Sequence, residues 1–461
     1  MSASLPEKEE EEANGPLRTK LPAKASKNDC GIWSVLKNCV GKDLSKVTMP
    51  IQFNEPISFL QRAAEHMEYA DLLGNVELAQ NPVDRIQHVA AFAVSALASN
   101  WNRLGKPFNP VIGETYELRR NDYKLICEQV SHHPPVSAFQ ADSPSFDFHG
   151  WVYPKLKLWG KSVEIHPKGV MKLHMKKFNE SYTWKNINCT VHGIIGGKMW
   201  IEHHGTMELH CVQTGLTLSL HFKPAGWFNK ELHVVEGFVT DSKKTKHRYV
   251  YGKWTETLRS CDMEAYEDYM KANAHKLRLG EPASDTSKRS PIMSPIPGKK
   301  IFAKFNSLSL GKSFSTSVDP NSGQDGDLSP GNDEEPPKLD GEIPEIPNSV
   351  TLWEVRARPD YSAEFYHFTL FAMSLNQVLP DMSSICPTDS RLRPDIRKME
   401  EGDLDKAAEE KGIIEEKQRK FLKTNNQADY KPVWFDKVGD DWICNGKYWI
   451  DSNKPHIAHL F

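Results

Sequence analysis

The chain has 461 residues, 26% of them charged, and a formal net charge of −3. Such a balance lacks the basic field of nucleic-acid-binding proteins, so it argues against nucleic acid as a partner. Eight scattered cysteines without C-x-x-C spacing argue against a disulfide framework, and the longest uncharged apolar stretch, 89–98, is far shorter than the ~20 residues that span a bilayer.

The N-terminal segment shows no sign of a secretory leader. Residues 1–28 are acidic and then basic without periodicity, which predicts disorder. A short amphipathic piece, GIWSVLKNCVG, follows, with Ile32, Leu36 and Cys39 near one helical face and Trp33 to one side. We therefore expect a cytoplasmic protein whose membrane contact is peripheral.

The segment NPVDRIQHVAAFAVSALASNW predicts a buried helix. Asn81 can cap it, and Pro82 suits its first turn. Its apolar residues, at spacings of three and four, form a core stripe: Ile86, Val89, Ala90, Ala93, Val94 and Leu97.

From about Thr115 to Thr257 the apolar period changes to two. The clearest hairpin pairs TMELHC with LTLSLHF around Gly215. Many such runs with little helix between them predict a large antiparallel β-barrel. A barrel much larger than eight strands encloses space that side chains do not fill.

The second half contains a compositional break. Residues 282–347 are rich in Pro, Ser, Gly and acids, which predicts a disordered insert. Its Ser-Pro pairs and basic-aromatic alternation are compatible with a phosphorylation-sensitive membrane contact, but a plain flexible loop is the favoured interpretation. The pattern resumes with VTLWEVRARPD and HFTLFAMSL in extended form, a helix from DLDKAAEEKGIIEEKQRKFLK, and an aromatic, strand-like tail.

Several short motifs suggest metal, phosphate or partner binding. Adjacent His132 and His133 cannot easily share one metal ion, and no further ligand stands at a usual spacing. GIIGGKMW differs from a phosphate loop in spacing and context, so its glycines are expected at a turn. His203 and His204 are expected on opposite faces of a strand near the surface. EFYHFT, residues 364–369, hints at a docking motif for a membrane-anchored protein, but it lacks acidic residues after it and lies in a strand-like run.

The stretch EQVSHHPPVSA, residues 128–138, carries the strongest signal. It resembles the signature of the oxysterol-binding protein family nearly letter for letter, and the likeness extends from about residue 29 to near the C-terminus. Supporting stretches are TMPIQFNEPISFLQR, GKPFNPVIGETYEL, YPKLKLWGKSVE and DSRLRPDIRKMEEGDLDKA. The chain is most similar to the short members, which are little more than the lipid-binding domain.

The resemblance implies a mainly β fold with flanking helices (α+β), in which a large, incomplete antiparallel barrel surrounds a hydrophobic tunnel. It also implies a lipid-transfer protein that is not an enzyme and needs no cofactor or metal. Its partners would be a sterol, a phosphoinositide and, transiently, membrane surfaces. The implied organisation is a disordered segment 1–28 and a lipid-binding domain 29–461, divided into a lid (29–47), an N-terminal helical part (48–114), a barrel (115–281), the insert (282–347) and a C-terminal part (348–461). The lid and the mouth of a hydrophobic tunnel would include Ile32, Trp33, Leu36, Leu44, Met49 and Phe53.

The family's headgroup-binding elements are all present. The resemblance assigns that role to Lys106, Asn109, His132, His133, Lys411, Glu415 and Arg419. A phosphomonoester carries about −1.5 to −2 charge and several acceptor oxygens, which imidazole N–H groups, a lysine and an arginine fork can satisfy. Residues four apart on a helix share one face, so the last three would form a row. Spacing alone favours an ordinary solvated face with i,i+4 salt pairs, and only the family resemblance favours a binding row.

The leading hypothesis is a carrier that exchanges sterol for phosphoinositide between membranes. The alternative is a lipid-gated sensor or scaffold that recruits a partner when loaded. The sequence does not choose among sterol, oxysterol and phosphatidylserine as cargo, nor among phosphoinositides.

Overall fold

The computed structural model describes residues 16–26, 49–120, 122–159, 161–194, 198–225, 232–274, 343–378, 385–424, 430–451, 454 and 460–461. The chain divides into two compact units, residues 1–269 with 332–461, and residues 270–331. Nearly all described residues belong to the first and larger unit. Among the described helices, none is both long and apolar enough to cross a bilayer.

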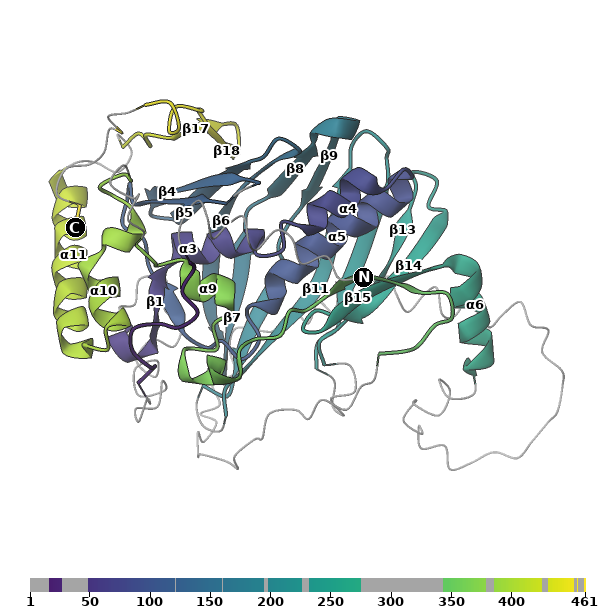
Figure 1. Cartoon of the computed structure of the whole chain (residues 1–461), viewed down its shortest axis with the longest axis horizontal. Helices are drawn as coiled ribbons and strands as arrows, with labels where there is room; N and C mark the ends of the chain where they lie inside the picture. The colour runs from purple at the N-terminus through teal and green to yellow at the C-terminus, as the bar shows by residue number, and fades with distance from the viewer. Residues whose placement is uncertain are drawn as a thin grey trace, which may run out of the picture. The chain divides into compact units, whose positions relative to one another are not determined.

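One 14-stranded sheet dominates the larger unit (Figure 1). In sheet order its main path is β16 (Val350–Glu354), β15 (Thr257–Asp262), β14 (Lys246–Lys253), β13 (Val234–Thr240), β12 (Thr217–Phe222), β11 (Trp200–Cys211), β10 (Asn188–His192), β7 (Ser162–Lys168), β6 (Phe146–Trp159), β5 (Pro135–Asp142), β4 (Lys124–His132) and β3 (Thr115–Arg119). Every pairing on this path is antiparallel, and the end strands β3 and β16 do not pair with each other. The sequence-based prediction of a large, incomplete antiparallel barrel is confirmed.

Two long strands, β6 and β11, each pair with different strands along their two halves. One half of β6 pairs with β7 and its other half with β8 (Met171–Met175), and β11 divides in the same way between β10 and β9 (Glu180–Trp184). The wall therefore forks into β7–β10 at one end and β8–β9 at the other. These two halves differ in how their inner faces are covered.

Short helices and two small sheets complete the unit. They are β1 (Asn54–Ser58) paired in parallel with β2 (Lys106–Phe108), β17 (Phe435–Val438) paired with β18 (Asp441–Cys444), α3 (Phe59–Ala64), α4 (Leu72–Leu78), α5 (Pro82–Ala98), α6 (Met263–Ala272), α9 (Leu370–Ser374), α10 (Pro394–Glu400), α11 (Leu404–Thr424), and 3-10 helices at Ile51–Phe53, Glu65–Met67, Lys176–Phe178, Asp360–Glu364 and Ser390–Leu392.

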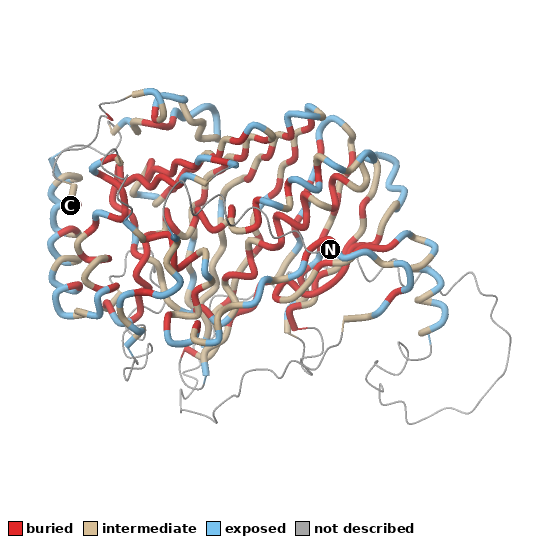
Figure 2. Tube along the Cα trace, viewed as in Figure 1, coloured by how far each residue is buried: buried red, intermediate tan, exposed pale blue. Residues whose placement is uncertain are grey.

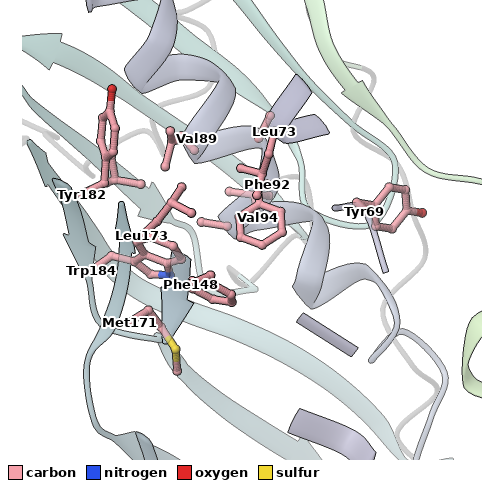
Figure 3. Packing of buried hydrophobic residues seen from close by; sticks show 14 of the residues in the cluster. Tyr69, Leu73, Val89, Phe92, Val94, Phe148, Met171, Leu173, Tyr182 and Trp184 are labelled. Atoms are coloured by element: carbon pink, nitrogen blue, oxygen red, sulfur yellow. The ribbon is translucent and has the colours of Figure 1, made fainter. Parts of the chain in front are cut away.

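Helix α5 forms as its sequence predicts and fills one half of the sheet. Asn81 accepts a hydrogen bond from the Val83 amide, and Pro82 occupies the first turn. The predicted apolar stripe is buried, and the intervening Ala91, Phe92 and Ser95 are buried as well. In the half of the sheet formed by β8 and β9, Phe92 meets Phe148 and Trp184 edge to face, and those two rings stack on each other (Figure 3). Buried residues concentrate along α5 and the strands that face it (Figure 2).

Residues 16–26 pack against the C-terminal part, although the sequence pattern predicts disorder there. Leu21 is buried beside Ile57 and Phe368, and Tyr361 donates to the Thr19 carbonyl at 3.1 Å. The Arg18 side chain pairs with Glu400. The segment lacks periodicity because it is stabilised by single contacts with a preformed surface rather than by a regular element.

The stretch around residue 365 is not extended, so the strand-like interpretation of HFTLFAMSL and EFYHFT is wrong. A 3-10 helix at Asp360–Glu364 is followed by two consecutive residues of positive φ, Tyr366 and His367, and then by α9. Phe365 and Phe368 are buried in the core. Aromatic side chains that are buried in the core are not available to bind another protein.

The hairpin β17–β18 belongs to a C-terminal segment that covers the outer face of β4–β6. At its centre lies the buried carboxylate of Glu128 on β4, which accepts from the main-chain amides of Val433 (2.8 Å) and Trp434 (2.9 Å). Burial raises the pKa of Glu128 to about 7 because these amides only partly replace water.

We expect Glu128→Gln to flatten the pH dependence of stability between about pH 4.5 and 7. In this window the folded protein keeps the proton that the unfolded chain releases, so the free energy of unfolding falls as pH rises and is level above pH 7. The fall amounts to at most about 3 kcal/mol. Urea unfolding of both proteins at several pH values measures it, and curves that stay parallel through the window would contradict it.

Candidate functional site

The histidine pair forms the tip of the β4–β5 hairpin. His132 pairs in register with Pro135, so His133 and Pro134 make a two-residue turn. The two imidazole rings lie 4.5 Å apart at 56°. Below the turn, Gln129 donates to the Ser131 carbonyl at 2.9 Å and accepts from the Ser137 hydroxyl at 2.5 Å, which holds the two strands in register.

His132 is neutral at physiological pH in the absence of a ligand. Burial and the neighbouring His133 lower its pKa to about 4. Its Nδ1 is enclosed and has no hydrogen-bond partner among the described residues. A group with negative charge at this nitrogen would supply the missing acceptor and raise the pKa.

Lys106 begins β2, which runs parallel to β1. Asn54 donates to the Lys106 carbonyl at 3.0 Å and so fixes the main chain. The preceding Gly105 is closely packed, because a Cβ there would lie 2.9 Å from the Cβ of Glu55. Burial and the nearby ammonium of Lys411 lower the pKa of the Lys106 amine to about 8.

The predicted row on α11 is present, with one difference. Lys411 lies 3.4 Å from a Glu415 oxygen and donates to the Met49 carbonyl at 2.6 Å. Arg419 is 4.0 Å from Glu415 but only 2.9 Å from Glu416, and its side chain is 55% exposed. Glu415 thus lies between the two cations, while Arg419 turns toward the outer side of the helix.

Asn109 has an exposed side chain and a fixed main chain. Its carbonyl accepts from Arg393 at 2.9 Å, and Arg393 also binds the buried Glu114 and Asp395. The side-chain amide of Asn109 therefore stands at the surface on a rigid support.

These residues come together in two groups. Lys411 and Glu415 pair at 3.4 Å, and Lys106 lies close enough to both for their charges to affect its pKa. The histidine hairpin joins them through the loop after β2, because Gly113 donates to the Gln129 carbonyl (3.0 Å) and Ile112 donates to Gln418 of α11 (3.1 Å).

Of the residues predicted for the lid and the tunnel mouth, two lie among the described residues and four do not. Ile32, Trp33, Leu36 and Leu44 lie outside the described residues. Met49 packs in an apolar cluster at the end of the β7–β10 half of the sheet. Its carbonyl is the one that Lys411 binds, so the apolar cluster and the cationic row meet at this residue. Phe53 is buried and ends the 3-10 helix before β1.

The inner face of the β7–β10 half is apolar but incompletely covered. Cross-strand registers place Leu156, Ile165 and Cys189 in one row, and Leu158, Val163 and Val191 in the next. All six are only partly buried, whereas the corresponding residues of β8 and β9 are fully buried under α5. The apolar side chains of this half therefore stay partly accessible, unlike those of the β8–β9 half.

A polar group that the sequence did not reveal borders this inner face. Arg62 donates to the Asn100 side chain at 2.5 Å, and the amide nitrogen of Asn100 lies 3.2 Å from His203 Nε2. Because arginine only donates, Asn100 must donate to His203. The predicted surface placement of His203 is therefore wrong: it is 4% exposed, and burial lowers its pKa to about 3. No motif marks these residues, since they come from three distant segments.

The last predicted motif is the glycine-rich stretch GIIGGKMW. GIIGGKMW connects β10 to β11, and Gly193 takes a φ of 74°, which favours glycine. Strands, not a helix, flank the connection, and Ile195, Gly196 and Gly197 lie outside the described residues.

Comparison with known proteins gives consistent results. The oxysterol-binding protein family model matches residues 31–453. Oxysterol-binding protein-related protein 1 of Homo sapiens is 47% identical over 96% of this chain and 44% of its own length. The chain thus spans less than half the length of the first such relatives. Oxysterol-binding protein-related protein 2 of Mus musculus is 44% identical over 94% of this chain and 85% of its own.

Solved structures show the same fold. The Osh1 ORD domain in complex with cholesterol is 31% identical, with a TM-score of 0.72 over 98% of this chain and 97% of that chain. The Osh3 ORD in complex with PI(4)P from Saccharomyces cerevisiae is 28% identical, with a TM-score of 0.69 over 95% and 96%.

Proposed function

The chain belongs to the oxysterol-binding protein family, and from this premise we propose that it binds a sterol or a phosphoinositide in one interior hollow and exchanges the two between membranes. Cholesterol and PI(4)P are the lipids in the two solved relatives. One observation carries the proposal to this chain: the Lys106–Lys411–Glu415 group meets an incompletely covered apolar face at Met49.

The polar end of this arrangement suits a phosphorylated inositol. Lys106 and Lys411 supply two point charges, and Arg419 has room to swing a planar fork toward the same place. The imidazoles of His132 and His133 add donors on a rigid turn. Asn109 offers an exposed amide on the loop after β2. Glu415 would hold the two cations of α11 and accept from a ring hydroxyl.

The apolar end suits either acyl chains or a sterol. The two partly covered rows on β6, β7 and β10 offer a continuous apolar wall. The Arg62–Asn100–His203 group offers a single polar contact at the border of that wall, which matches the one hydroxyl of a sterol. A sterol removed from water gains on the order of 10 kcal/mol, at ~25 cal/mol per Å².

Exchange between membranes is possible because a bilayer buries the apolar surface of the sterol just as the protein does. The donor bilayer already buries the sterol, so the net preference for the protein interior is a small difference and both loading and release occur. A phosphoinositide adds roughly 1.5–3 kcal/mol per charge-assisted bond at the rim. Binding and release suffice, so the proposal contains no catalytic step. Membrane association is proposed to be peripheral and transient, with residues 29–47 as the predicted lid.

A liposome exchange assay tests the proposal. One vesicle population holds sterol, the other a phosphoinositide, and catalytic amounts of protein are added. We expect many lipid equivalents per protein to move in both directions, and sterol transport to accelerate when the acceptor carries phosphoinositide. Uptake that stops at one equivalent would instead favour a lipid-gated sensor, and no uptake of either lipid would overturn the proposal.

A further inference from the structure

One lysine of the site differs from the other sheltered lysines in its pairing. Within the described part of the chain, seven lysines are at least partly buried, and six of them have a carboxylate within 4 Å. The pairs are Lys172–Asp441, Lys223–Glu236, Lys253–Glu256, Lys398–Glu401, Lys411–Glu415 and Lys454–Glu117. The seventh, Lys106, has no such partner among these residues.

The surroundings of Lys106 favour its neutral amine. Among the charges that act on it, the ammonium of Lys411 outweighs the carboxylate of Glu415. That carboxylate is already paired with Lys411, which also donates to the Met49 carbonyl. With a pKa of about 8, roughly a tenth of the Lys106 amine is neutral at pH 7, against less than about one part in a thousand for an ordinary lysine. Burial together with a neighbouring cation is the arrangement that activates lysine nucleophiles in proteins.

We propose that the Lys106 amine is a covalent modification site that takes lipid aldehydes entering the mouth as reversible Schiff bases. The Nζ lone pair attacks the aldehyde carbon, and the carbonyl oxygen leaves as water with the two amine protons. R–CHO and the amine thus give R–CH=N–Lys106 and H₂O, with no oxidant or reductant. The inference rests on the proposed function, because the same mouth that admits cargo tails would deliver the aldehyde.

The modification would also change the site's charge. A neutral imine removes one of the cations proposed to hold a phosphate, and the ammonium of Lys411 disfavours protonation of that imine. An aldehyde-loaded protein is therefore expected to lose phosphoinositide capture while its apolar wall stays intact.

Trapping experiments on the full chain test the inference. The protein is incubated with hexadecanal or, separately, with water-soluble propanal, reduced with cyanoborohydride, and mapped by peptide mass spectrometry. We expect Lys106 to label at least tenfold faster than Lys411 or the exposed Lys155 and Lys157, with a rate that levels off above about pH 8. Labelling spread over exposed lysines in proportion to their accessibility would overturn it.

Variants separate this inference from the proposed function. Lys106→Arg keeps the charge and should abolish the fast adduct, whereas the matched Lys411→Arg should retain it. Lys411→Met should move the plateau to higher pH, because it removes the neighbouring ammonium that lowers the pKa of Lys106. A plateau that stays in place or moves to lower pH would contradict the inference that the labelled amine is activated beside Lys411. If propanal selects Lys106 but hexadecanal gains no advantage, the nucleophile stands and the lipid path fails. If exchange proceeds but neither aldehyde selects Lys106, only the nucleophile fails.

Discussion

Replacing both histidines of the hairpin, His132→Ala with His133→Ala, is expected to weaken phosphoinositide capture by at least about 100-fold and to leave sterol capture within about twofold. Each imidazole can contribute a hydrogen bond to a charged phosphate, worth about 1.5–3 kcal/mol, so two together exceed the ~2.7 kcal/mol of a 100-fold change. The effect is selective because the hairpin tip lies apart from the apolar rows of β6, β7 and β10. Extraction of each lipid from vesicles measures it.

A matched control comes from the outer face of the barrel. His210 and His221 are exposed and bond only Thr217 and Thr206 at the surface. The same double alanine change there should alter neither lipid. If the His132–His133 variant extracts phosphoinositide as well as the native chain, with an unchanged melting temperature, the assignment of the rim fails.

Removing the guanidinium in Arg103→Met is expected to lower the free energy of unfolding by about 3–5 kcal/mol. Arg103 is fully buried and binds two carboxylates, Glu55 at 2.9 and 3.1 Å and Glu65 at 2.7 and 2.8 Å. Without it, Arg62, 3.2 Å from Glu55 and 4.0 Å from Glu65, is the cation left within 4 Å of these two buried carboxylates in the described part of the chain. Denaturant unfolding followed by circular dichroism measures the loss.

The same substitution should also affect the site. Glu55 lies on β1 and packs against Gly105, so its displacement would shift Lys106. Arg248→Met, which removes a half-exposed pair with Asp84 at 3.5 Å, is the control and should cost no more than about 1 kcal/mol. Equal stability of the two variants would show that the buried group carries no more weight than a surface pair.

Features whose residue pattern lies within one segment could be predicted from the sequence alone. The cap and stripe of α5, the alternation of β11 and β12, and the spacing of Lys411, Glu415 and Arg419 depend on neighbours within one segment, and all three are found in the structure. The signature around His132 likewise identified the family. Local periodicity predicts such features because the buried face of a helix or strand repeats along the chain.

Only the tertiary structure decided which distant groups meet. The Arg62–Asn100–His203 group and the packing of residues 16–26 on the C-terminal part leave no periodic trace in the sequence. The same is true of the lack of a carboxylate within 4 Å of Lys106 among the described residues. The alternating aromatic residues of 364–369 predict an extended strand, yet two positive φ values turn the stretch into the core. A buried polar contact needs one partner at one distance, and the sequence neighbourhood of either residue does not specify which partner the fold brings to it.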